Sequence, residues 1–63
     1  MTALVYRHKR TAKILEYSSS MEPWTHCVER RVDGELRNRA NFMSYGDAQI
    51  DLENARIEGY DID

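Results

Sequence analysis

The side chains best suited to chemistry in this chain are one cysteine, two histidines and many carboxylates near its C-terminal end. Nucleophilic catalysis needs a base in contact with the nucleophile and a third group that orients the base. His26 stands next to Cys27, but neighbouring residues of a strand point to opposite faces, so these two side chains cannot pair there. We therefore expect no catalytic residue and predict that the chain is not an enzyme.

Patterns for metal, ion or phosphate binding are also missing. One cysteine and two histidines cannot supply the four well-spaced ligands of a zinc site. Paired carboxylates such as Asp47 and Asp51 support acid–base chemistry only inside a cleft that separates their pKa values. Residues 61–63 offer too few oxygens for a calcium loop, and the three glycines are too scattered for a phosphate loop. We predict no metal ion and no cofactor.

Four of the six acidic residues of residues 40–63 belong to a predicted C-terminal α-helix over residues 45–58. Ser44 followed three residues later by Asp47 is typical of a helix start, and Gly59 suits the position just after a helix end. A stripe at helical spacing is expected to face a sheet: Tyr45, Ala48, Leu52 and Ala55. Ile50 and Ile57 lie on nearly the opposite side. Either the chain ends partly cover them, or they form a second apolar strip for a partner.

A β-hairpin is predicted over residues 24–42, with its turn at Asp33-Gly34. A two-residue loop would pair residue 32 with residue 35 and divide the apolar side chains between the two faces. An odd-numbered loop, with Gly34 at positive φ in a bulge-type turn, gathers them on one face, so we favour the bulged turn. That face then holds Trp24, His26, Val28, Leu36, Ala40 and Phe42.

The two ends of the chain complete the predicted fold. Residues 1–17 suit a β-hairpin, because β-branched and aromatic residues favour strands, although a helix fits their spacing almost as well. Residues 60–63 are expected to form an acidic tail. We predict one domain over residues 1–63, of the α+β class: a small antiparallel sheet of three to four strands packed against one C-terminal α-helix.

Composition points to the cytoplasm. A single cysteine cannot form an internal disulfide, as a secreted domain of 63 residues would be expected to do. The basic residues follow the N-terminal apolar stretch, the reverse of a secretory signal, and no apolar run is long enough to span a membrane. So short a chain has a thin core, and homodimer formation is an alternative source of stability.

Charge separates along the chain. Residues 1–39 hold eight lysines and arginines against five acidic residues, whereas residues 40–63 hold one arginine against six acidic residues. We therefore expect a basic sheet face and an acidic helix. The basic face is predicted to contain Cys27, Glu29, Arg31, Arg37, Arg39 and Asn41, with Glu29 near Arg37 or Arg39.

The pattern Trp24 … Val32-Asp33-Gly34 … Phe42-x-Ser44-x-x-Asp47-Ala48 covers residues 24–48. It resembles the three-stranded-sheet-plus-helix domains at the N-termini of some phage-type integrases, and it is similar to several small phage inhibitor proteins. The resemblance implies a sheet covered by one helix and, for the integrase domains, DNA binding through the sheet.

We predict a small accessory or regulatory protein, of the type that phages and mobile elements encode, that binds a macromolecular partner, above all another protein. The candidate partner-binding residues lie on the helix: Asp47, Ile50, Asp51, Ile57 and Glu58. The alternative is a nucleic-acid-binding module that uses the basic sheet face, with Arg31, Arg37 and Arg39. The negative net charge disfavours that alternative, because neutralising phosphates supplies most of such affinity.

Overall fold

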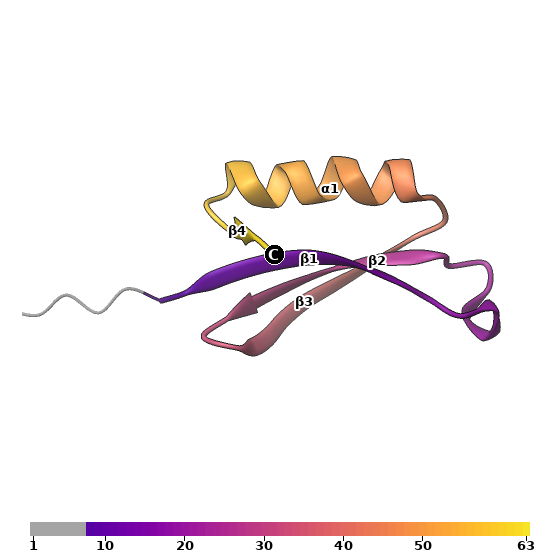
Figure 1. Ribbon diagram of the computed structural model, residues 1–63, viewed down its shortest axis with the longest axis horizontal. Coiled ribbons are helices and arrows are strands. Elements are labelled where there is room, and N and C mark those ends of the chain that lie inside the picture. Colours follow the sequence, from indigo (N-terminus) through magenta and orange to yellow (C-terminus); the bar gives the residue numbers. More distant parts are fainter. Residues whose placement is uncertain (1–7) are drawn as a thin grey trace, which may run out of the picture.

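The computed structural model describes residues 8–63 and shows an α+β fold, a four-stranded sheet with one helix packed on it (Figure 1). The strands and the helix are β1 (Arg10–Glu16), β2 (His26–Val32), β3 (Glu35–Phe42), α1 (Tyr45–Ile57) and β4 (Asp61–Ile62), with a short 3-10 helix at Ser19–Met21. The predicted class and the position of the C-terminal helix are confirmed. No helix formed by residues 8–63 is long and apolar enough to cross a membrane.

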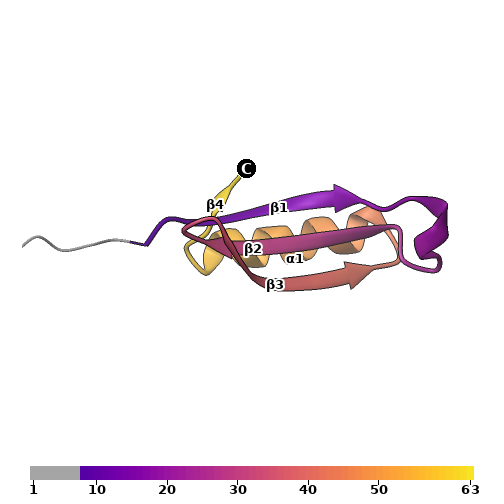
Figure 2. The ribbon, with the colours of Figure 1, turned by 90° about the horizontal axis from the view of Figure 1, so that it is seen from below.

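The sheet has the strand order β3-β2-β1-β4, so β2 is central between β1 and β3 (Figure 2). The first three strands are antiparallel, as predicted, but β4 pairs parallel with Thr11 and Ala12 of β1, which makes the sheet mixed. Within the acidic tail predicted for residues 60–63, Asp61 and Ile62 form β4. The parallel direction follows from the path of α1, which returns the chain to the start of β1 before β4 begins (Figure 1).

The structure tests only the second half of the β-hairpin predicted for residues 1–17. Residues 10–16 form the strand β1, which pairs with β2 along its whole length. The first strand of the hairpin predicted for residues 1–17 falls largely on residues 1–7, which lie outside the described part of the chain. For residues 10–16 the structure therefore favours the strand over the helical alternative.

The hairpin turn differs from the prediction. Asp33 and Gly34 both have positive φ, 53° and 82°, and Val32 pairs with Glu35, so the loop has two residues. The bulge that we placed in the turn lies inside the hairpin, next to Arg30 and Arg31. The tight turn matches the twist of the strands, and the bulge then shifts the pairing by one residue.

This displaced bulge sets which side chains face the helix. His26 pairs with Phe42 and Val28 with Ala40, so these four share a face, as predicted. Leu36 instead lies opposite Arg31 on the other face and is 40% exposed, so its predicted position is wrong. Trp24 precedes β2 in an exposed loop and does not belong to either strand. A bulge changes the face only for residues on one side of it, and the sequence alone did not locate it.

The core between sheet and helix is built from small side chains. Ala48 and Ala55 of α1 are fully buried, as are Val28 of β2 and, to within 1%, Ala12 of β1. Leu52 is half-buried, whereas Tyr45 is exposed at the start of the helix. The predicted stripe is therefore the buried side of α1 over most of its length. Small residues let the helix lie close to the strands.

Both ends of α1 are capped. The side-chain oxygen of Ser44 accepts a hydrogen bond from the amide of Asp47 at 3.1 Å, as the sequence predicts. At the other end, Gly59 has a φ of 102°. The amide of Gly59 donates to the carbonyl of Arg56 and that of Tyr60 to the carbonyl of Ala55, both at 3.0 Å. Gly59 thereby reverses the chain toward β4.

Two glycine substitutions should have opposite effects on stability. A Cβ at Gly59 would sit 2.5 Å from a guanidinium nitrogen of Arg10, in a backbone conformation that disfavours side chains. Gly59→Ala should therefore lower the free energy of unfolding by about 1–2 kcal/mol. Gly46 lies within α1 and has open space around it. Gly46→Ala should raise the free energy of unfolding by about 0.5–1 kcal/mol.

Urea denaturation of both variants measures this difference. A Gly59→Ala protein that is as stable as the parent would contradict the role assigned to this turn.

Candidate functional site

The outer helix face, defined here as Gly46, Ile50, Glu53, Asn54 and Ile57, points away from the sheet. All five residues are exposed. Ile50 and Ile57 are 65% and 71% exposed, the two most exposed large apolar side chains of residues 8–63. Neither isoleucine is covered by a chain end within the described residues, so the face presents two uncovered aliphatic side chains, one near each end of the helix.

The structure divides the five candidate partner-binding residues between two sides of α1. Ile50 and Ile57 lie on the outer helix face, and Asp47 is exposed in the first turn. Asp51 and Glu58 instead turn toward the sheet and pair with Arg30. The predicted acidic surface is therefore smaller than its sequence suggests, because two of its carboxylates are used inside the molecule.

Arg30 connects the central strand to the helix. Its side chain lies on the helix side of β2 and is only 11% exposed. Nη1 lies 2.8 Å from Oδ2 of Asp51, and Nε lies 3.2 Å from Oε1 of Glu58. The hydrogen bond with Asp51, more than any other contact, raises the pKa of Arg30 above its ordinary value. The guanidinium therefore stays charged between the two layers.

Tyr60 and Arg10 extend this cluster toward β4. The guanidinium of Arg10 lies 4.9 Å from the centre of the Tyr60 ring, and that of Arg30 lies 5.8 Å from it. Nη2 of Arg10 also donates to the carbonyl oxygen of Glu58 at 3.0 Å. Sequence reasoning missed the cluster, although strand alternation from His26 and Val28 to Arg30 was a signal for it.

The open sheet face, the side not covered by α1, contains a buried glutamate. Glu29 is 2% exposed, and Nε of Arg39 donates to its Oε2 at 3.0 Å. Nη2 of Arg31 lies 3.4 Å from Oε1 of the same carboxylate. The hydrogen bond from Arg39 is the main cause that holds the pKa of Glu29 below its ordinary value. The predicted neighbourhood of Glu29 and Arg39 is therefore confirmed.

The three arginines of the alternative nucleic-acid surface thus have different environments. Arg31 and Arg39 share the Glu29 carboxylate. Arg37 lies at the bulge, is exposed, and has Glu35 at 4.0 Å. Because Glu29 offsets part of the charge of two arginines, the open sheet face is less basic than the sequence indicates.

Cys27 and His26 lie on opposite faces of β2, as strand alternation predicts. Cys27 is fully buried on the open face, where its hydrogen bond is the main cause that raises the pKa of Tyr17. The Tyr17 hydroxyl, just beyond the end of β1, donates to Oδ1 of Asn41 at 2.6 Å, and Asn41 is the residue of β3 that pairs with Cys27. The His26 ring lies on the helix side, 5.3 Å from that of Tyr45.

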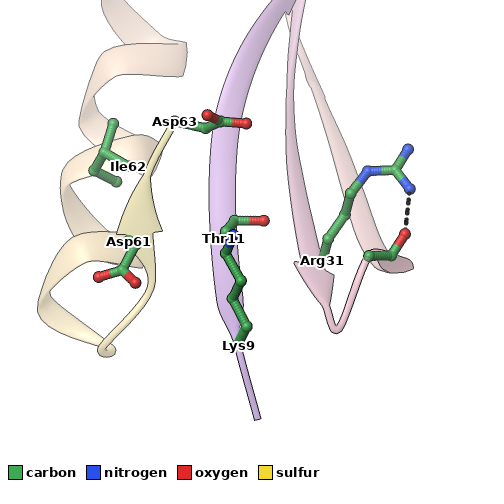
Figure 3. Close-up of a pocket in the computed structure, with 7 residues that line it drawn as sticks. Lys9, Thr11, Arg31, Asp61, Ile62 and Asp63 are labelled. Carbon is green, nitrogen blue, oxygen red and sulfur yellow. Dashed lines mark hydrogen bonds between the residues drawn. The ribbon is translucent and has the colours of Figure 1, made fainter.

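Two hollows lie near β4. The first, of about 370 Å³, combines acidic and basic side chains from Lys9, Thr11, Arg31 and residues 61–63 (Figure 3). Arg31 is already engaged there, because it donates to the carbonyl oxygen of Gly34 at 3.0 Å. The second, of about 340 Å³, lies on the helix side of β1. Residues 8–63 contain no group of three or more His, Cys, Asp or Glu side chains that could hold a metal ion.

Comparison of the chain with protein-family models, with curated proteins and with solved structures finds no match in any of the three. The outer helix face, the open sheet face and the strand edges are therefore the features from which a function can be inferred.

Removal of the Arg30 guanidinium should destabilise the fold. Arg30→Ala leaves Asp51 and Glu58 without their shared cation, and should lower the free energy of unfolding by about 1.5–3 kcal/mol. Arg30→Met combined with Asp51→Leu should recover much of that loss, because the unpaired carboxylate is replaced by apolar contact. Arg56→Ala is the control, since its ion pair with Glu53 is exposed, and should have little effect. Equal losses for Arg30→Ala and Arg56→Ala in urea denaturation would refute this role.

Glu29 should make stability depend on pH. Because folding lowers the pKa of Glu29, its stabilisation is complete above the ordinary carboxyl value of 4.5 and is lost as pH falls through the lowered value. Glu29→Gln should therefore cost about 1–3 kcal/mol at pH 7, and the cost should shrink as the pH falls through the lowered pKa of Glu29. Denaturation at stepped pH measures it, with Glu22→Gln in the exposed loop as control. A cost that does not change with pH would contradict an ionic role.

Proposed function

We propose that this chain is a small non-enzymatic accessory or regulatory protein that acts in the cytoplasm by binding a protein partner through the outer helix face. The observation that carries the proposal is the exposure of Ile50 and Ile57 on one side of a helix whose other side is already packed. Burial of an isoleucine side chain yields about 1.5–3 kcal/mol, so the two residues offer a compact anchor for a partner.

The surrounding charge indicates the chemistry of that partner. Asp47 is exposed at the start of the helix, and Glu53 lies between the two isoleucines, paired with Arg56. A partner groove with an apolar floor and a partly basic rim would complement this surface. The anchors are seven residues apart on one helix, the spacing read by grooves that bind amphipathic helices.

The nucleic-acid alternative keeps one observation in its favour. Arg37 is exposed at the bulge of β3, where a phosphate could reach it. Glu29 argues against the nucleic-acid alternative, because its buried carboxylate already pairs with Arg31 and Arg39. A duplex would have to approach this negative charge, which weakens the electrostatic term that dominates such binding. We therefore place the protein partner first.

Charge introduced on the outer helix face should abolish partner capture without unfolding the protein. Ile50→Asp combined with Ile57→Asp should leave the free energy of unfolding within about 0.5 kcal/mol per site, because both side chains are exposed. Affinity capture from the native host, read by quantitative mass spectrometry, should lose its specific partner. Met43→Asp is the matched control, since Met43 is 62% exposed but lies outside the helix.

The same proteins distinguish the alternatives. Binding to duplex or single-stranded DNA that falls steeply with salt and with Arg37→Glu would favour the nucleic-acid module. A sedimentation mass above 7.4 kDa that returns to the monomer in the isoleucine variant would identify a second copy as the partner. Unchanged capture by the isoleucine variant would contradict the proposed surface.

A further inference from the structure

The outer edge of β1 is only partly covered. β1 pairs with β2 from Arg10 to Glu16, but β4 pairs only with Thr11 and Ala12 on the other side. From Lys13 to Glu16, the edge has no neighbouring strand among residues 8–63. Figure 2 shows β4 beside the beginning of β1 and the rest of that edge uncovered.

The direction of the backbone groups decides whether this edge can accept a strand. The amide of Tyr17 donates to the carbonyl of Thr25 at 2.9 Å, and the amide of Asp33 donates to the carbonyl of Lys9 at 2.7 Å. Odd-numbered residues of this segment therefore turn their backbone groups toward β2. The carbonyl of Ala12 accepts from the amide of Asp63 at 2.9 Å, so even-numbered residues turn theirs outward. Ile14 and Glu16 consequently present backbone donors and acceptors to the open edge.

A side-chain hollow adjoins the same edge. It has a volume of about 340 Å³ and is lined by Ile14, Glu16, His26, Tyr45, Leu52 and Asp63. Its apolar wall comes from Ile14, Leu52 and Tyr45, and its carboxylates come from Glu16 and Asp63. A lysine or arginine side chain fits such a site, because its apolar stem packs against the wall while its cation meets the carboxylates.

The other edge of the sheet is less suited to an added strand. β3 is bulged opposite Arg30 and Arg31, and a bulge disrupts the regular spacing that a neighbouring strand needs. β3 also carries Glu35, Arg37 and Arg39 along an exposed stretch. The edge of β1 between Lys13 and Glu16 has regular register with β2 throughout.

We propose that an extended basic segment of a partner protein adds to this edge as a further strand, in line with β4. Its backbone pairs with Ile14 and Glu16, and a lysine or arginine side chain enters the hollow between Tyr45, Glu16 and Asp63. This mode is β-strand addition, in which main-chain hydrogen bonds give affinity and side-chain sites give specificity. The site is separate from Ile50 and Ile57, so it stands or fails independently of the proposed helix interface.

The test uses a blocked peptide of alternating lysine and valine, with a glutamate–valine peptide of the same length as its control. The lysine peptide should bind with a dissociation constant on the order of 1 mM or tighter. Hydrogen exchange followed by NMR should show slower exchange of the Ile14 and Glu16 amides, with the outer amides of β3 unchanged. Glu16→Lys should weaken binding by about tenfold, whereas Glu22→Lys, the same charge change in an exposed loop, should not.

Several results would overturn the proposal. If the lysine peptide does not bind at about 5 mM, or if the glutamate peptide binds equally well, the occupant of this edge is not a basic segment. If the peptide binds but the Ile14 and Glu16 amides do not exchange more slowly, the edge of β1 is not the binding site. Protection that rises with protein concentration in the absence of peptide assigns the edge to a second copy of the chain. The variant Ile50→Asp with Ile57→Asp should bind the peptide normally, which keeps failure of the helix interface distinguishable from failure of this site.

Discussion

The arrangement depends on two oppositely charged neighbours in the central strand that face opposite sides of the sheet. Arg30 points to the helix and pairs with Asp51 and Glu58, whereas Glu29 points to the open face and pairs with Arg39 and Arg31. A shift of β2 by one residue would exchange the two sides. It would place Glu29 against the helix carboxylates and Arg30 among arginines. Electrostatics therefore enforces the register of a strand whose apolar pattern is short.

This constraint matters because the apolar core is small. Among residues 8–63, the buried hydrophobic side chains are Ala12, Cys27, Val28, Ala48 and Ala55, none of them large. Stabilisation from apolar burial scales with the area removed from water, so five such side chains contribute less than a core of leucines would. The Arg30 contacts with Asp51 and Glu58 supply a geometric restraint that small alanines do not, because they fix how α1 lies along β2. The Gly59 turn and β4 then follow from that position.

The sequence supported the local features of the fold better than its long-range contacts. Ser44, Gly59 and the alanine stripe identified the ends and the buried side of the helix, because caps and periodicity are properties of a few neighbouring residues. Leu36 was assigned to the wrong face of the sheet. The position of the bulge depends both on the twist that the turn must match and on which apolar side chains become buried. The pairing of Arg30 with Asp51 and Glu58 was not predicted, because it joins long side chains from separate elements. Strand alternation predicted the neighbourhood of Glu29 and Arg39, but charge counted along the chain did not reveal that Arg30 neutralises Asp51 and Glu58.

The separation of charge between sheet and helix therefore has a different meaning in the folded chain than in the sequence. On the helix, Arg30 neutralises the carboxylate of Asp51. On the sheet, Glu29 offsets part of the positive charge of Arg39. The surfaces proposed for partners are the outer helix face, where Ile50 and Ile57 lie beside Glu53, and the edge of β1, where backbone groups point outward. On the helix, Asp51 pairs with Arg30 and both Ala48 and Ala55 are buried on the same side of α1, which leaves Ile50 and Ile57 on the outer side. The proposed helix surface therefore depends on how α1 packs against the sheet.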